Sequence, residues 1–404
     1  MAQRHFLACC TVAIGALMAQ PGLAQSDNPV EQGAPNVPQF KPYFPEQTRA
    51  PAMVSGIALQ AQVLADGLEH PWGIAVLPSG GYLVTERSGE LRMLAKDGTL
   101  SGPIGGVPKV LARRQGGLLD VTLDPEFSNN RLVYLTFSKP LPKGLSATAA
   151  ARGRLSEDGT KLQDVQEIFV QTPGSPTPMH YGSRILFDNE GHAFITTGEH
   201  SSENERVFAQ DLDKTYGKVI RLNKDGTIPD GNPFIAQSGA EPSIWSYGHR
   251  NIQGAAINPA SGQLWTIEHG PRGGDELNKP EPGKNYGWPV ISYGENYSGS
   301  PVGQGITQAP GMEQPRYYWD PVIAPGGMTF YQGDMFPDWK GDIIASSLRP
   351  GGLVRLKLDG DTVVGEERLL EDIGRVRDVQ EAPDGALLVL IDAGNGKVLR
   401  VTPK

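Results

Sequence analysis

The residues best suited to holding a cation stand in "IEHGPRGGDELN" (267–278), where Glu268, Asp275 and Glu276 flank three glycines and a proline. Hard cations such as Ca²⁺ take carboxylate and backbone carbonyl oxygens as ligands, and a Gly-Pro turn followed by acids supplies both. The sequence contains no H-E-x-x-H or C-x-x-C pattern suited to zinc. The stretch therefore favours a calcium site over an ordinary acidic turn.

A candidate general base is His180 in "MHYGSR" (179–184). It stands at the junction between a loop and a predicted strand. If the strands surround a central channel, a side chain at such a junction can face it. An imidazole titrates near neutral pH, so it can take a proton from a hydroxyl group. A half-buried histidine bonded to the backbone is the alternative, and the residue types leave both interpretations open.

Four arginines could bind an anion: Arg250, Arg349, Arg375 and Arg377. Residues two apart on a strand share one face, so Arg375 and Arg377 can point the same way. Guanidinium groups grip carboxylates with two parallel hydrogen bonds, which favours a ligand that carries carboxylates. The alternative is that the arginines are solvated or paired with nearby acids such as Asp372 and Asp378.

The elements that must position these residues follow a repeat. From residue 70 onward, an apolar strand, a turn rich in Pro, Asp, Asn or Gly, and a second apolar strand recur six times. The instances are "GIAVLPSGGYLVTE", "DVTLDPEFSNNRLVYLTF", "RILFDNEGHAFITTGE", "GAAINPASGQLWTIE", "MTFYQGDMFPDWKGDIIAS" and "DVQEAPDGALLVLID". Alternation with period two indicates paired strands, and six such units predict an all-β, six-bladed β-propeller of four-stranded antiparallel blades.

Two segments of this predicted propeller need separate treatment. The stretch at 58–68 precedes the first unit and "GKVLRVTPK" ends the last, so we expect them to share a blade and close the ring. The Ala-rich stretch "LSATAAARGRL" (145–155) is expected to form a loop. The folded domain is expected over residues 56–404.

The N-terminus reads as an export signal. Residues 1–24 combine Arg4, an apolar run too short to span a bilayer and small residues up to Ala24, which predicts a cleaved signal peptide and a periplasmic protein. Both cysteines, Cys9 and Cys10, lie inside it, so the mature chain would have no disulfide. Residues 25–55 are polar and proline-rich and are expected to be a flexible leader.

The charge of the chain limits its partners. The formal net charge is −9, and removing residues 1–24, with one arginine and no acid, makes it −10. Nucleic-acid binding needs clustered Lys and Arg, which are absent from the sequence. We therefore expect no nucleic-acid partner and no membrane-spanning segment.

Taken together, the motifs resemble the pyrroloquinoline quinone (PQQ)-dependent sugar dehydrogenases of the soluble glucose dehydrogenase type, and most closely the periplasmic aldose sugar dehydrogenases. The resemblance covers nearly all of residues 60–403. Its carriers are "QGGLLDVTLDPEF", "HYGSRILFD", "YGHRNIQGAAINP", "EHGPRGGDELN", "GKNYGWPVISYG" and "RVRDVQEAPDG". This family has a six-bladed propeller, in agreement with the repeat count.

The resemblance implies roles for individual residues. His180 would take the proton of the sugar's anomeric hydroxyl while hydride passes to PQQ, giving a lactone. Two Ca²⁺ ions are implied, one at the cofactor bound by the carbonyls of Gly270 and Pro271, and a structural one near Glu276 and Tyr286. The implied cofactor contacts are Gln115, Arg250, Asn251, Tyr297, Ser347, Leu348, Arg349, Arg375, Val376 and Arg377.

Two departures from the glucose dehydrogenases limit the resemblance. This chain has Arg349 where they have lysine, and Met179 precedes the histidine where they have an acid, so another group must orient His180. The electron acceptor, a quinone or a cytochrome, is not identified. Alternative interpretations are a sorbosone-type aldehyde dehydrogenase of the same superfamily, a calcium-dependent propeller hydrolase acting on lactones, and a non-catalytic binding propeller.

Overall fold

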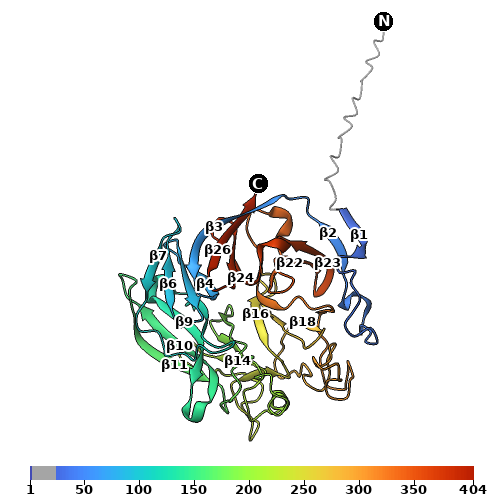
Figure 1. Cartoon of the computed structure of the whole chain (residues 1–404), viewed down its shortest axis with the longest axis horizontal. Helices are drawn as coiled ribbons and strands as arrows, with labels where there is room; N and C mark the ends of the chain where they lie inside the picture. Colours follow the sequence, from blue (N-terminus) through green and yellow to red (C-terminus); the bar gives the residue numbers. More distant parts are fainter. Residues whose placement is uncertain (2–23) are drawn as a thin grey trace.

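The chain folds as a ring of six sheets around a central axis, shown in Figure 1 for the computed structural model, and the four blade strands of each sheet are antiparallel. The structure describes residue 1 and residues 24–404. Five sheets have four strands, and the fifth along the chain carries two further strands at its outer edge. The predicted six-bladed propeller is therefore confirmed.

Each blade runs from an inner strand at the axis to an outer edge strand. The inner strands are β4 (Pro71–Val76), β8 (Leu118–Leu123), β12 (Ile185–Phe187), β16 (Ile252–Ile257), β20 (Pro325–Phe330) and β24 (Val376–Glu381). The second strands are β5 (Tyr82–Glu86), β9 (Leu132–Pro140), β13 (Ala193–Thr196), β17 (Leu264–Glu268), β21 (Ile343–Ser347) and β25 (Leu387–Ile391). Each apolar unit of the sequence thus forms the first hairpin of one blade.

The two outer layers complete the blades. The third strands are β6 (Leu91–Leu94), β10 (Ser146–Leu155), β14 (Lys218–Leu222), β18 (Asp275–Asn278), β22 (Leu353–Asp359) and β26 (Gly396–Pro403). The edge strands are β7 (Leu100–Pro103), β11 (Leu162–Val170), β15 (Ile244–Tyr247), β19 (Tyr317–Trp319), β23 (Thr362–Leu369) and β3 (Leu59–Leu68). The expected ring closure is confirmed, because β3 pairs antiparallel with β26 from Leu59↔Pro403 to Leu68↔Gly396.

The helical segments are single turns in loops. They are η1 (Pro45–Gln47), α1 (Phe127–Asn130), η2 (Pro142–Gly144), η3 (Arg206–Ala209), η4 (Pro337–Trp339) and η5 (Glu371–Ile373). Within residues 24–404, none of the helices has the length and hydropathy of a membrane span.

The hydrophobic core is divided among the blade junctions. One cluster of buried apolar side chains lies between each pair of neighbouring blades, including the pair formed by the last and first blades. Both faces of each sheet are therefore covered, which explains why most residues of the inner and second strands are buried. The ring is held by burial between blades and leaves the axis free for polar residues.

The Ala-rich stretch at 145–155, expected to be a loop, forms strand β10 instead. Ala149, Ala150 and Ala151 are at most 1% exposed, and β10 pairs with β9 on one side and β11 on the other. Small side chains suit this position because the neighbouring blades approach closely on both faces. Tertiary packing overrides the weak strand propensity of alanine here.

The prediction that residues 25–55 form a flexible leader is also wrong. The N-terminal strap (residues 24–54) contains β1 (Ala24–Pro29) and β2 (Pro51–Val54), and β2 pairs with β23 through Ala52↔Glu366. Figure 1 shows both strands along the outer edge of that blade. Residues 2–23 of the predicted signal peptide (1–24), which include both cysteines, lie outside the described residues.

Asp320 is the main anchor of the strap. Its carboxylate accepts hydrogen bonds from the Asn36 backbone N–H at 2.8 Å, the Asn36 side chain at 2.9 Å and the Val37 N–H at 3.0 Å. Further along, Gln47 is fully buried and bonds Gln314 and Tyr293. Proline-rich composition alone suggested disorder, and these long-range polar contacts override it.

We predict that Asp320→Ala destabilises the protein by about 2 kcal/mol or more, because three donors lose a charged acceptor. Denaturant unfolding measures the change, and limited proteolysis should show faster cleavage within residues 28–50. Asp97→Ala, at an exposed turn, is the control and should leave the denaturation midpoint close to that of the wild type. Equal stability of the Asp320 and Asp97 variants would contradict the anchoring role.

Candidate active site

A cavity of about 310 Å³ opens at the axis on the face where the inner strands begin and the second strands end. Loops from different blades converge there, so residues far apart in the sequence become neighbours. Nine of the predicted site residues line it, namely Gln115, His180, Arg250, Asn251, Tyr297, Leu348, Arg349, Arg375 and Arg377.

The other predicted site residues lie outside the cavity lining. Ser347 and Val376 are fully buried, and the Ser347 hydroxyl donates to the Ile323 carbonyl at 2.7 Å. Gly270 and Pro271 are buried in the loop between β17 and β18. Glu276 and Tyr286 lie further out along the same blade, as described below.

His180 is held by two contacts made through different atoms. Its Nδ1 lies 2.8 Å from Oε1 of Glu199, and its backbone N–H donates to Oε1 of Gln115 at 2.8 Å. The second Glu199 oxygen accepts from the Ser201 N–H at 2.8 Å, so the carboxylate is fixed as well. With Nδ1 engaged, Nε2 is the ring atom left to act on a ligand in the cavity.

Glu199 is therefore the group that orients His180, the role that the residue types could not assign. It stands three residues after the end of β13 and is fully buried. The only signal in the sequence was that four of the six repeat units, including the one that ends at Glu199, end in Glu or Asp. The backbone of His180 has φ 47°, in the left-handed region that few residues other than glycine adopt.

The environment keeps His180 neutral. Burial lowers its pKa below the ordinary 6.5, the nearby Arg250 guanidinium lowers it further, and Glu199 opposes both effects. At pH 7 the imidazole is therefore unprotonated. A neutral imidazole with a carboxylate behind it can accept a proton, because Glu199 stabilises the imidazolium that forms.

The arginines make the cavity strongly basic. Arg377 donates from NH1 to Oε1 of Gln253 at 2.8 Å, and NH2 lies 3.2 Å from Oδ2 of Asp392, which Arg375 approaches at 3.4 Å. The partner acid is thus Asp392, and neither Asp372 nor Asp378 pairs with these arginines. Among the described residues, Nε of Arg250 and Nε of Arg377 are buried without a hydrogen-bond partner. This excess of cationic donors fits a ligand with several carboxylates.

The loop at 267–278 packs beside the cavity. Arg250 donates to the Gly270 carbonyl at 2.6 Å, a contact that a cation bound to that oxygen would replace. Asp275 accepts from the N–H groups of Gly270, Ile323 and Ala324, and burial raises its pKa to about 7. The carbonyl and carboxylate oxygens of this loop have the chemistry of a hard-cation site.

Two carboxylates lie opposite each other further along this blade. Glu268 on β17 pairs in register with Glu276 on β18, and Asn278 donates to both at 3.0 and 3.2 Å. Burial, followed by repulsion from Glu268, raises the pKa of Glu276 well above its ordinary value. His249 bonds Glu268 at 2.9 Å and stacks on Tyr286 at 4.7 Å. Such a carboxylate pair fits a bound cation.

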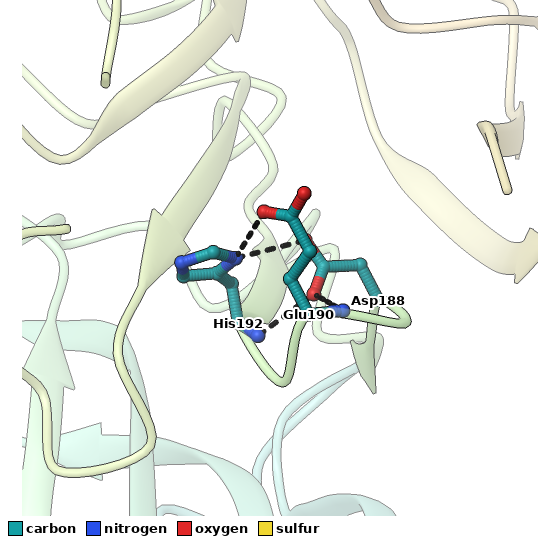
Figure 2. Close-up of side chains that lie close together, drawn as sticks. All are labelled: Asp188, Glu190 and His192. Carbon is teal, nitrogen blue, oxygen red and sulfur yellow. Dashed lines mark hydrogen bonds and ion pairs between the residues drawn. The ribbon is translucent and has the colours of Figure 1, made fainter. Parts of the chain in front are cut away.

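A third acidic group lies at the opposite end of blade three, on the turn between β12 and β13. Figure 2 shows Asp188, Glu190 and His192 with their possible ligand atoms within 4.8 Å of one another. NH2 of Arg221 lies 2.9 Å from Nδ1 of His192 and 3.5 Å from Glu190. Because a guanidinium already supplies the positive charge, we describe this group as an ion-pair cluster.

We predict that Glu199→Gln lowers turnover at pH 7 by about tenfold or more. A neutral amide does not stabilise the imidazolium, and it does not fix the tautomer of the neutral imidazole. Losing the carboxylate also lowers the pKa of His180 further. In a profile of kcat/KM against pH, the acid limb should therefore move to lower pH. An unchanged limb would contradict the pairing of Glu199 with the base.

The fold and the site together define a class: an enzyme built on a six-bladed propeller, with a carboxylate-backed histidine beside a basic axial cavity. Comparison with known proteins makes this specific. Residues 68–400 match the family model described as Glucose / Sorbosone dehydrogenase. The chain belongs to this family, and the prediction of an oxidoreductase acting on sugars is confirmed.

Three relatives illustrate the similarity. Aldose sugar dehydrogenase YliI of Escherichia coli (strain K12) is 47% identical over 359 residues, covering 88% of this chain and 94% of that protein. The apo-form crystal structure of the soluble aldose sugar dehydrogenase from Escherichia coli superposes with a TM-score of 0.83 at 46% identity, covering 86% and 100%. The PQQ-bound aldose sugar dehydrogenase of Streptomyces coelicolor gives a TM-score of 0.70 at 28% identity, covering 86% and 99%.

Proposed function

We propose that the protein is a periplasmic, PQQ- and calcium-dependent dehydrogenase that oxidises the anomeric carbon of aldose sugars to lactones. The observation that carries the proposal is the His180–Glu199 pair beside a cavity lined by five arginines, Arg87, Arg250, Arg349, Arg375 and Arg377. Hydride transfer from a sugar to this cofactor requires a general base and a site that binds the cofactor's carboxylates, and both lie at the cavity on the propeller axis. The PQQ-bound state of the Streptomyces relative supports the choice of cofactor.

When bound, PQQ would supply the hydride acceptor, and Ca²⁺ would supply Lewis-acid activation of its carbonyl group. Arg349, Arg375 and Arg377 would hold the cofactor's carboxylates. Gln115, Asn251 and Tyr297 complete the lining, and Tyr297, at 76% exposure, stands at the entrance. The oxygens of Gly270 and Pro271 would hold the cofactor's calcium, and Glu276 with Tyr286 the structural one.

The chain's own residues then account for the proton. Nε2 of His180 takes the proton of the anomeric hydroxyl, and Glu199 stabilises the resulting charge through Nδ1. The backbone contact from Gln115 keeps the ring from moving away from the substrate. The electrons would leave to an acceptor, a quinone or a cytochrome, that the proposal does not specify further.

Calcium removal should separate the metal's roles. We expect a chelator to abolish sugar-dependent dye reduction, and added Ca²⁺ to restore it, because no residue of the cavity replaces a Lewis acid. The midpoint temperature of thermal unfolding should also be lower for the metal-free protein, since Glu268 and Glu276 lose their counter-ion and repel each other. Full activity after complete metal removal would contradict the calcium dependence.

A further inference from the structure

A buried ion triad closes the propeller axis beneath the cavity. NH1 of Arg184 lies 2.9 Å from Oδ1 of Asp120, and NH2 lies 3.0 Å from Oδ1 of Asp378. All three side chains are less than 8% exposed. They come from three different blades, since Asp120 is on β8, Arg184 directly precedes β12 and Asp378 is on β24.

The other three blades also meet at this triad. Nε of Arg184 donates to the Gln253 carbonyl on β16 at 2.7 Å. On β4, a Cβ at Gly73 would come within 2.7 Å of Oδ1 of Asp120, and on β20, a Cβ at Gly327 would come within 1.7 Å of Oδ1 of Asp378. Only glycine permits so close an approach at these two positions. All six inner strands thus come close to one guanidinium and its two acids.

The triad is connected directly to the cavity. Gln253, whose carbonyl binds Arg184, uses its side chain to accept from Arg377 at 2.8 Å and to donate to the Gly182 carbonyl at 3.0 Å. The guanidinium of Arg184 also lies 4.4 Å from the Trp72 ring, and that of Arg377 lies 5.9 Å from the same ring. Trp72, Gly182, Gln253 and Arg377 all line the cavity.

Stability alone is a poor explanation for this arrangement. Taking charges out of water is costly, and well-packed apolar residues often replace buried ion pairs without loss of stability. A guanidinium does what apolar residues cannot, because its hydrogen bonds have a fixed direction. Nη1 and Nε of Arg184 form such bonds to Asp120 and to the Gln253 carbonyl, and the contact of Nη2 with Asp378 is an ion pair without a hydrogen bond. One of those partners, Gln253, also accepts a hydrogen bond from Arg377.

We propose that Arg184 is a positioning residue for cofactor binding, which fixes the floor of the cavity so that Arg377 meets a cofactor carboxylate in the correct orientation. This inference rests on the proposed function. Arg184 acts through Gln253 and Trp72 and does not line the cavity itself.

The chain offers a matched control in Arg355. This arginine is fully buried, pairs with Asp342 at 2.7 Å and Glu367 at 2.6 Å, and lies 5.2 Å from the Trp339 ring. It sits inside blade five and does not line the cavity. Arg184→Lys and Arg355→Lys therefore make the same chemical change in similar surroundings at different distances from the site.

The test is a calorimetric titration of the apo-protein with PQQ in the presence of Ca²⁺. We expect Arg184→Lys to raise the Kd for PQQ at least tenfold and Arg355→Lys to change it less than twofold, whatever each does to the thermal midpoint. At saturating PQQ, the KM of Arg184→Lys for the sugar should stay within twofold of the wild type.

The outcomes separate the two proposals. A wild-type Kd for Arg184→Lys, or an equal rise in both lysine variants, would overturn the positioning role while the proposed function stands. A wild-type protein that does not bind PQQ would overturn the proposed function and this inference with it. Should Arg184→Lys fail to fold, Asp378→Asn keeps the shape of the triad and should weaken PQQ binding in the same direction, and an unchanged Kd there would overturn the role.

Discussion

His180→Asn is expected to bind PQQ with nearly wild-type affinity and to lose turnover by about 10²- to 10⁴-fold, the contribution of a positioned general base. Asparagine keeps the size and polarity of the side chain and cannot take up a proton. The backbone N–H that binds Gln115 is unaffected by the change. Steady-state dye reduction at saturating sugar and PQQ measures the loss.

The control is His192→Asn, which removes a histidine that also contacts a carboxylate, at the opposite end of the same blade. It should leave turnover within about twofold of the wild type. Unchanged turnover in His180→Asn would remove this residue from the mechanism. A loss of PQQ binding would instead make it a cofactor ligand.

Replacing Arg375 and Arg377 together with alanine should abolish measurable PQQ binding. Each arginine can offer a charge-assisted hydrogen bond of about 1.5–3 kcal/mol to a carboxylate, so the pair is worth about 10²- to 10⁴-fold in Kd. Titration of the apo-protein with PQQ gives the value directly. The double variant also removes two of the three side-chain partners of Asp392 and leaves His70, whose Nδ1 lies 2.7 Å from Oδ1 of Asp392.

Because buried Asp392 would then lack both guanidinium partners, Arg349→Ala/Arg375→Ala, which keeps Arg377, provides an independent check. Arg349 is exposed at the cavity and Arg375 is half exposed. Arg154→Ala/Arg400→Ala, at surface ion pairs, is the control and should bind PQQ normally. If the arginine variants kept full activity on lactones or esters, a calcium-dependent hydrolase would replace the dehydrogenase.

The blades could be predicted from the sequence because their signal is local. Each first hairpin carries its own alternation and turn, as in "DVQEAPDGALLVLID", which forms β24 and β25. The closure by β3 also followed from a strand-like stretch at each end of the chain. In contrast, β10 and the N-terminal strap were missed, because packing against neighbouring blades decides their conformation.

The residues of the site also divide into those that the sequence reveals and those that only the folded chain brings together. His180, Arg250 and Arg377 could be identified because base and anion-binding side chains stand out at the starts of strands. Glu199 could not be assigned, although it ends a repeat, because its pairing with His180 depends on how blade three folds back over 19 residues. The Asp120–Arg184–Asp378 triad was equally hidden, since only the closed ring brings its three blades together.

The most direct test of the account is reconstitution of sugar oxidation. The purified protein, free of metal and cofactor, would receive Ca²⁺, PQQ and a panel of aldoses, with each component omitted in turn and dye reduction followed. The account predicts activity that requires both Ca²⁺ and PQQ, with lactone as the product. Absence of sugar-dependent reduction in the complete mixture, together with no PQQ binding, would contradict it.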